Sequence, residues 1–194
     1  MRLMPLAESQ LSDAQRPLFE SIKAGVGAKY QNFVTTREDG ALLGPWNAWL
    51  HDPEIGSAIW QLSQTMTKAR RIPDRARQVA ILVTGGHLDA AYEIYAHGAV
   101  AISVHEMSQA RVAAIAAGDR PDDLDEEEDT AFSVAVALTG GGALPQQLYD
   151  RAVRVFGVDG ATELFYLVGY YCLVAVTLNA FDIRVPAAQS ASDA

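Results

Sequence analysis

A glutamate and a histidine stand four residues apart, Glu93 and His97, in a segment whose other side chains are mostly apolar or small. On an α-helix this spacing places both side chains on one face, with about 5–6 Å between their Cβ atoms. A carboxylate beside an imidazole can act as an acid–base pair, because histidine titrates near neutral pH and the carboxylate selects its tautomer. The alternative is a solvated surface pair, which contributes only a few tenths of a kcal/mol.

The remaining histidines and the glycine run carry no metal or phosphate motif. His51, His87, His97 and His105 form no His-x-x-x-His pair with a glutamate between them, so we expect no metal site. Gly140–Gly142 has no lysine after it and does not join a strand to a helix. A turn is therefore favoured over a phosphate-binding loop.

Arg75 and Arg77 are candidates for binding an anionic substrate. They belong to a basic cluster, residues 68–77, that precedes the Glu93/His97 pair in the sequence. Arginine can hold a carboxylate through two parallel hydrogen bonds. The alternative is a solvated connector whose charges pair with nearby acidic side chains.

Aromatic residues on either side of this cluster are candidates for a pocket wall. Trp46, Asn47 and Trp49 form a short segment that is either such a wall, with Asn47 supplying a hydrogen bond, or a lid packed on the core. Tyr92 and Tyr95 lie on different faces of the helix that carries Glu93, so we expect at most one of them, with Tyr92 as our choice, to line the pocket.

The region around these residues resembles the carboxymuconolactone decarboxylase family, which also contains the alkyl hydroperoxidase D-like proteins. The likeness is carried by Arg-x-Arg-x-Val-Ala-Ile-Leu-Val at 75–83, by Tyr92-Glu93 and by Ala96-His97 before a small-residue helix. It is densest over residues 72–118, and it is weaker over 44–53 and 169–180.

This resemblance implies an all-α fold of the alkyl hydroperoxidase D type, assembled as a homo-oligomer such as a dimer, trimer or hexamer. It covers about residues 45–185, within a single domain that we expect to span residues 1–194. The apolar closing helix, residues 162–181, agrees with burial on all sides or in an oligomer interface.

The chain departs from the peroxidase branch of the family at three positions. The two cysteines of that branch match Ala90 and Glu93 here, and its glutamate in the preceding helix matches Gln78. The single cysteine, Cys172, is far away in the sequence, in an apolar run. Dithiol chemistry requires an attacking thiolate and a resolving partner, so the sequence argues against thiol peroxidase activity.

The resemblance implies a cofactor-free decarboxylase that acts on a small carboxylated lactone or a related acid from aromatic breakdown. In this hypothesis an arginine orients one carboxylate, and His97, oriented by Glu93, supplies the proton to carbon. Two alternatives remain open. A pocket without a cation near the pair would favour a hydrolase or isomerase of another small carbonyl compound. A pair that is splayed apart, or covered by side chains, would favour a non-catalytic oligomer that binds a ligand or partner.

Composition narrows the other possibilities. The 194 residues are 49% hydrophobic, which supports a sizeable core in a soluble protein. Residues 121–194 hold 12 acidic and 3 basic side chains and carry the whole net charge of −9, which argues against nucleic-acid binding. We expect no membrane span, and the first residues lack a signal-like apolar stretch, so we expect a cytoplasmic protein.

Helical periodicity dominates the chain. We expect helices over residues 11–24, 45–51, 53–68, 74 to about 85, 89–103, 108–117, 126–138, 145–156 and 162–181. Asp74 should cap its helix, Gly25 and Gly157 should end theirs, and the acidic run 122–129 should form a helix N-terminus rather than a metal or partner site. The tail, 186–194, is expected to fray.

Overall fold

The computed structural model describes residues 2–27 and 31–186, and within these ranges the chain is helical, with a single isolated β-bridge, between Thr36 and Leu42. The expected all-α class is therefore confirmed, and the tail beyond Pro186 lies outside the described residues. The elements are η1 (Glu8–Gln10), α1 (Arg16–Gly27), α2 (Pro45–Leu50), α3 (Pro53–Lys68), α4 (Asp74–His87), α5 (Ala91–Ser103), α6 (Gln109–Ala117), α7 (Glu126–Thr139) and α8 (Gln146–Ala180).

Most expected helix ends agree with the structure to within a few residues. Helix α3 opens at Pro53, with the Asp52 side chain accepting from the amide of Ile55, and α6 ends at Gly118. Helix α7 begins at the acidic run, where Asp125 is the N-cap and Glu128 completes a capping box. The acidic run is thus a helix N-terminus, as its sequence predicts.

Four expected ends are wrong. Helix α1 starts at Arg16 rather than residue 11, because Pro17 is tolerated only in a first turn, and it continues past the expected stop at Gly25 to Gly27. Asp74 is the first helical residue and not the cap, since the carbonyl of Pro73 already accepts from the amide of Arg77. Helix α4 also continues through Gly85 and Gly86 to His87.

The two glycines of α4 serve close packing instead of ending the helix. A Cβ atom on Gly86 would lie 1.9 Å from the carbonyl oxygen of Ala116, so α6 can cross α4 only at a glycine. Gly85 makes the corresponding space for a side chain of α5, Glu93.

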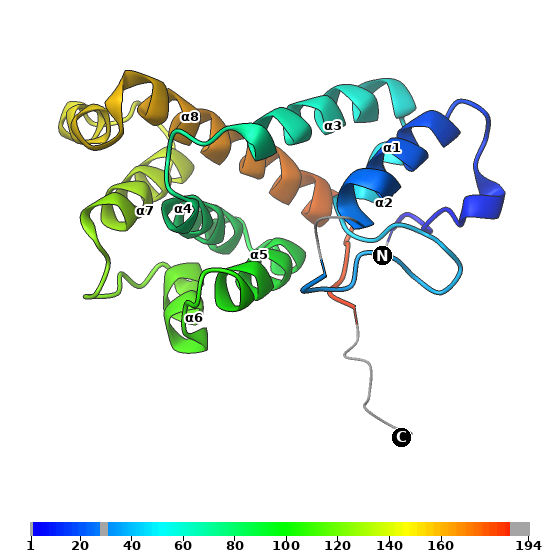
Figure 1. The fold of residues 1–194 in the computed structure, drawn as a ribbon, viewed down its shortest axis with the longest axis horizontal. Helices are drawn as coiled ribbons and strands as arrows, with labels where there is room; N and C mark the ends of the chain where they lie inside the picture. The colour runs from blue at the N-terminus through cyan, green and yellow to red at the C-terminus, as the bar shows by residue number, and fades with distance from the viewer. Residues whose placement is uncertain (1, 28–30, 187–194) are drawn as a thin grey trace.

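Helix α4 forms the centre of the fold. It packs against α5, α6, α7 and α8, and each residue from Ala76 to Gly85 is buried. Figure 1 shows α8 running diagonally across the molecule, with α6 and α7 towards one end and α1, α2 and α3 towards the other. Helices α4 and α5 thus lie between the α6–α7 end of the molecule and the end that carries α2.

Helix α8 is less buried than its composition suggests. Its backbone leaves the helical conformation at Gly157, where φ is 70°. The first helical segment therefore ends at Gly157, as expected, and the second begins directly after it. Leu164, Leu167 and Leu178 are buried, whereas Tyr166 is 68% exposed. Within the described residues α8 is the one helix long and apolar enough to cross a membrane, but half of its apolar window is buried, as in the core helices of soluble proteins.

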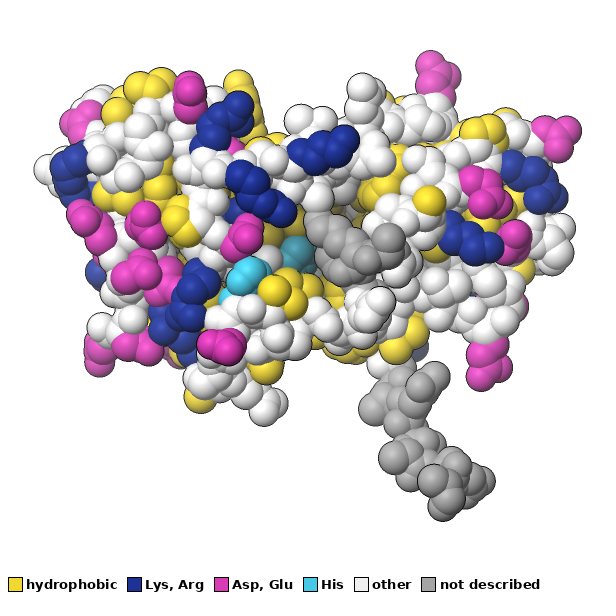
Figure 2. All heavy atoms as spheres, viewed as in Figure 1, with side chains coloured by type: hydrophobic (Ala, Val, Ile, Leu, Met, Phe, Trp, Pro, Cys, Tyr) yellow, Lys and Arg dark blue, Asp and Glu magenta, His cyan; other side chains and the backbone are white. Residues whose placement is uncertain are grey.

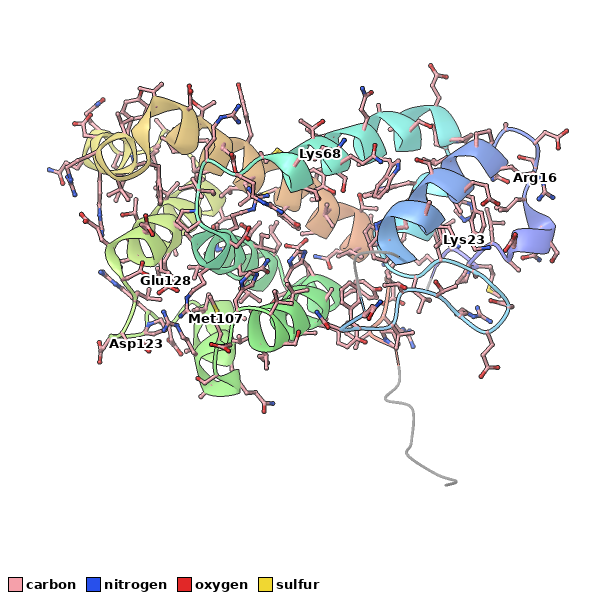
Figure 3. The ribbon with its side chains drawn as sticks, in the orientation of Figure 1. Arg16, Lys23, Lys68, Met107, Asp123 and Glu128 are labelled. Carbon is pink, nitrogen blue, oxygen red and sulfur yellow. The ribbon has the colours of Figure 1, made fainter. Side chains whose placement is uncertain are left out.

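Ion pairs fasten the helices at the α6–α7 end. Glu128 is 2% exposed and pairs with Arg75 of α4, at 2.7 Å, and with Arg111 of α6. Arg111 also reaches Asp123 at 2.9 Å. Figure 3 shows Asp123 and Glu128 in this region, near Met107 in the connection between α5 and α6.

Candidate functional site

A partly open cavity of about 50 Å3 lies between α2, α3, α5 and α8. A water molecule needs roughly 10–15 Å3 by this measure, so the space corresponds to roughly three to five waters. Its walls are mostly aromatic or apolar. They are formed by Phe33, Pro45, Trp46, Trp49, Ser63, Tyr92, Glu93, Ala96, His97, Val100, Tyr170, Tyr171, Val174 and Leu178. We call this space the inner cavity.

Glu93 is the one acidic side chain among the described residues that line the inner cavity. It is 2% exposed, and neither carboxyl oxygen has a hydrogen-bond partner among the residues described. Burial removes water from the charged form, and this holds the pKa of Glu93 well above its usual value. Burial thus favours the protonated carboxyl over the carboxylate, and the protonated form can donate a proton.

Gly85 positions this carboxyl group. The space where a Cβ atom of Gly85 would stand is 3.1 Å from Glu93 Oε1 and 3.4 Å from its Cγ. Helix α5 can therefore bring Glu93 directly against the backbone of α4. The glycine is needed for this approach, and Glu93 in turn fills the groove that the missing side chain leaves.

His97 lies one turn after Glu93 in the same cavity wall. Its Nδ1 atom is 3.0 Å from Oε1 of Gln78, a buried residue of α4. An amide oxygen can only accept, so Nδ1 carries the proton and Nε2 is the basic nitrogen of the neutral ring. The edge of the imidazole meets Tyr171 with the ring centres 4.9 Å apart.

Two tyrosines of α5 form hydrogen bonds to the non-helical segment that contributes Phe33 to the cavity wall. Tyr92 Oη donates to the carbonyl of Val34 at 3.3 Å, and the amide of Val34 donates to Tyr95 Oη at 3.1 Å. Phe33, the neighbour of Val34, lines the cavity and stacks on Trp46. Burial raises the pKa of the Tyr92 phenol, so this hydroxyl stays protonated. Tyr92 lines the cavity and Tyr95 does not, as expected.

A second hollow of about 200 Å3 lies on the other side of His97. We call it the outer groove. His97, Val100 and Tyr171 line both spaces, so the imidazole stands in their shared wall. The outer groove is the more polar of the two and includes Arg70, Arg77, Gln78, Asp74 and His105. Figure 2 shows histidine side chains at the centre of one face, bordered by basic and apolar groups.

The structure brings four of the seven predicted site residues together in the inner cavity: Glu93, His97, Trp46 and Tyr92. It places Asn47, Arg75 and Arg77 elsewhere. The Asn47 side chain accepts from the amide of Leu6 at 3.0 Å and donates to its carbonyl, so it ties the N-terminal segment to α2.

Both arginines predicted to bind substrate have partners within the protein. Arg75 Nε donates to Glu128 at 2.7 Å, and its Nη1 donates to the carbonyl of His105. Arg77 is 7% exposed, pairs with the buried Glu163 and donates to the carbonyl of Met66 at 2.7 Å. Of the residues that the structure describes, no Lys or Arg lines the inner cavity.

Sequence reasoning missed Tyr171 as a site residue, and it considered Trp49 only as part of the aromatic segment with Trp46 and Asn47 without choosing it as a site residue. Trp49 is three positions after Trp46, so on a helix the two share a face, and this spacing was the signal that favours Trp49 over Asn47. Sequence reasoning also placed Cys172 far from the site. In the structure the charge of Glu93 is near enough to help raise the pKa of the Cys172 thiol, after burial, the larger cause.

Metal ligation finds no support in the arrangement of the described residues, where no three His, Cys, Asp or Glu side chains gather as ligands.

No family model and no curated protein sequence matches this chain. Solved structures do match. A cysteine-to-alanine variant of the debrominase Bmp8, in complex with 2,3,4-tribromopyrrole, superposes with a TM-score of 0.72 at 17% identity, covering 96% of this chain and 92% of its own. The ligand-free debrominase also gives 0.72 and 17%, covering 94% and 91%.

The alkylhydroperoxidase AhpD core of an uncharacterized peroxidase-related protein from Ralstonia eutropha JMP134 matches with a TM-score of 0.72 at 14% identity, over 95% of this chain and 92% of that one. The fold is therefore the all-α AhpD-like fold. These identities establish the fold alone, and none of the three named structures is a decarboxylase.

Proposed function

We propose that this protein is an acid–base enzyme that moves a proton next to the carbonyl group of a small, uncharged ring compound. The observation that carries the proposal is Glu93, a buried carboxyl group that has no hydrogen-bond partner among the described residues and belongs to the wall of a cavity that His97 also lines. Burying an unpartnered polar group costs free energy, so its retention in an apolar wall favours a role towards a ligand.

The reaction uses the two side chains in opposite roles. His97 Nε2 removes a proton from the carbon next to the carbonyl, and the Glu93 carboxylic acid gives its proton to the carbonyl oxygen, which forms an enol. Return of a proton from His97 to the same carbon or to a conjugated one, with return of the enol O–H proton to the Glu93 carboxylate, regenerates the ketone or gives its isomer. A positioned acid or base of this kind contributes roughly 10²–10⁴-fold in rate.

Three features support an uncharged substrate. The described lining of the inner cavity contains no cation. Its walls are aromatic, which favours a flat apolar ring. A debrominase of the same fold binds 2,3,4-tribromopyrrole, another small ring. The absence of a cation beside the pair is the feature that we expected of an isomerase or hydrolase, and a pair that lines one cavity disfavours the non-catalytic alternative.

Decarboxylation is the second candidate function. It is favoured by the outer groove, where Arg70 and Arg77 lie near the far side of His97. A carboxylate there would have cations within the groove while His97 delivers a proton to carbon. Both arginines already pair with acids, Asp74 and Glu163, which makes this candidate the weaker one.

Deuterium exchange tests the main proposal without knowledge of the natural substrate. The protein is incubated in D2O with a panel of small cyclic ketones and lactones, and NMR follows loss of the proton next to the carbonyl. We expect catalysed exchange that falls by about 10²–10⁴-fold in His97→Asn. His51→Asn, a change at an exposed histidine after α2, is the control and should exchange at the wild-type rate.

The same variants test decarboxylation with 4-carboxymuconolactone, read as CO2 release and a change in ultraviolet absorbance. Exchange without CO2 release supports proton transfer as the activity. CO2 release that depends on His97 would transfer the function to the second candidate. Absence of both in folded wild-type protein would contradict both.

A further inference from the structure

The inner cavity contains a second buried polar group that lacks a protein partner. Trp49 of α2 lines the cavity and is 4% exposed, and its indole Nε1–H has no acceptor among the residues that the structure describes. Trp60 is the useful contrast. It lies outside the cavity lining, and its Nε1–H donates to Ser21 Oγ at 2.9 Å.

Such a donor is uncommon in a folded protein. Buried indole N–H groups normally find an acceptor, and an orphaned donor costs about 1–3 kcal/mol. Here Trp49 and Glu93, whose indole N–H and carboxyl group both lack a partner among the described residues, line a single small cavity. One acceptor atom on a ligand could relieve both costs, because a carbonyl oxygen has two lone pairs.

We propose that Trp49 Nε1–H and the Glu93 carboxyl together bind the carbonyl oxygen of an uncharged five- or six-membered ring ketone or lactone. This inference rests on the proposed function, since both use the inner cavity, and it adds the substrate class and a second donor. Trp49 is then a binding residue whose hydrogen bond strengthens as negative charge develops on the oxygen during enol formation.

The remaining walls fit this ligand class. Trp46, Tyr92, Tyr170 and Phe33 offer ring faces and edges to a flat ring. The volume of about 50 Å3 is smaller than the roughly 150 Å3 cavity that encloses a benzene ring, so a small ring would fill this space and extend into its open side. A carboxylate is disfavoured because its charge would be buried without a cation in the described lining.

The test is binding, measured apart from turnover, with three probes of one size. Cyclopentanone carries the acceptor, methylenecyclopentane replaces the carbonyl oxygen with CH2, and cyclopentanecarboxylate carries a charge. Proton–nitrogen NMR of the three tryptophan indoles, assigned with single Trp→Phe variants, reports on Trp49 directly. We expect cyclopentanone to shift the Trp49 Nε1–H resonance and to bind about tenfold more tightly than methylenecyclopentane, with weaker binding of the carboxylate.

Matched variants complete the test. Trp49→Phe should show a smaller preference for the ketone over its CH2 analogue than wild type, because only the Glu93 donor remains, and Trp60→Phe should keep the wild-type preference. If Trp49→Phe does not fold, the wild-type titration still decides. A Trp49 resonance that does not respond to cyclopentanone, or equal affinities for ketone and analogue in wild type, overturns the proposal.

The two proposals fail in different ways. Ketone binding with a shifted Trp49 resonance but no deuterium exchange would leave the binding site standing and remove the reaction. Exchange without any response of Trp49 would keep the reaction and remove Trp49 from it.

Discussion

His97 Nδ1 lies 3.0 Å from Gln78 Oε1, and this contact sets the tautomer of the histidine. It joins α5 to the central helix α4 through a neutral amide. A carboxylate in this place would favour the imidazolium form, whereas the amide accepts from Nδ1–H without adding charge. We therefore expect the identity of residue 78 to influence whether His97 acts as a base or as an acid.

Gln78→Glu should raise the pKa of His97, because a buried carboxylate stabilises the positively charged ring. The basic form of His97 then appears only at higher pH, and deuterium exchange at neutral pH falls. NMR titration of the His97 ring measures the shift directly. Gln78→Leu is the control, because it removes the hydrogen bond without adding charge and should not raise the pKa. An unchanged His97 titration in Gln78→Glu would show that residue 78 does not control the ring.

Glu93 should make the stability of the protein depend on pH. Its pKa in the folded protein lies well above the ordinary value of 4.5, so the folded state holds a proton that the unfolded state releases above about that pH. Its contribution is therefore fully present below pH 4.5 and is lost as pH rises through the folded pKa.

Urea unfolding at several pH values should show wild type losing free energy of unfolding relative to Glu93→Gln between pH 5 and pH 8. The comparison uses the change in the free energy of unfolding with pH. Any pH-independent destabilisation caused by the amide in Glu93→Gln therefore cancels. Parallel curves for the two proteins would mean that Glu93 is ionised when folded, contrary to the burial argument.

Gly85→Ala should disturb the site more than the fold. The new methyl group would meet Glu93 Oε1 at 3.1 Å and push the carboxyl group by a few tenths of an ångström. We expect slower deuterium exchange and no gain in stability, although alanine normally stabilises a helix interior by about 1 kcal/mol relative to glycine.

Gly169→Ala in α8 is the matched control. A Cβ atom there meets nothing within 4 Å, so the full helix-propensity gain of about 0.5–1 kcal/mol should appear in urea unfolding, with exchange unchanged. Equal stabilisation by both substitutions, without loss of exchange in Gly85→Ala, would refute the positioning role of Gly85.

Arg77 should prove structural. Arg77→Leu leaves Glu163 buried beside a lost partner, and breaking a buried pair costs about 3–5 kcal/mol. Arg70→Leu is the control from the same groove, since its pair with Asp74 is exposed and 3.5 Å long, and we expect a change within about 0.5 kcal/mol. A stable Arg77→Leu variant with a raised KM would restore the predicted role in substrate binding.

Local signals in the sequence are sufficient for much of the fold. Pro53 and Gly118 mark helix ends through backbone chemistry that acts within one or two residues, and the structure agrees at both. Gly85 and Gly86 also predict a helix end from their residue type, but in the structure they allow close packing of other helices. The groups that they contact, Glu93 and Ala116, approach only when α5 and α6 pack on α4, so the sequence alone does not reveal these contacts.

The candidate site shows the same division. The four-residue spacing of Glu93 and His97 is local, and the two do line one cavity. The partners of Arg75 and Arg77 are Glu128 and Glu163, which are 53 and 86 residues away, so the sequence could not distinguish a substrate contact from an internal ion pair. The sequence was sufficient to predict that Trp49 shares a helix face with Trp46, but it was not sufficient to predict that its indole N–H lacks an acceptor among the described residues.

The position of His97 in the wall between the inner cavity and the outer groove has a consequence for inhibition. In the proposed reaction, solvent protons would reach the ring from the polar groove, and the carbon chemistry would take place in the inner cavity. A molecule bound in the groove would then block the exchange of protons with solvent without competing for the inner cavity. We expect such a compound to slow deuterium exchange while leaving ketone binding almost unchanged, so that a screen restricted to substrate mimics would overlook it.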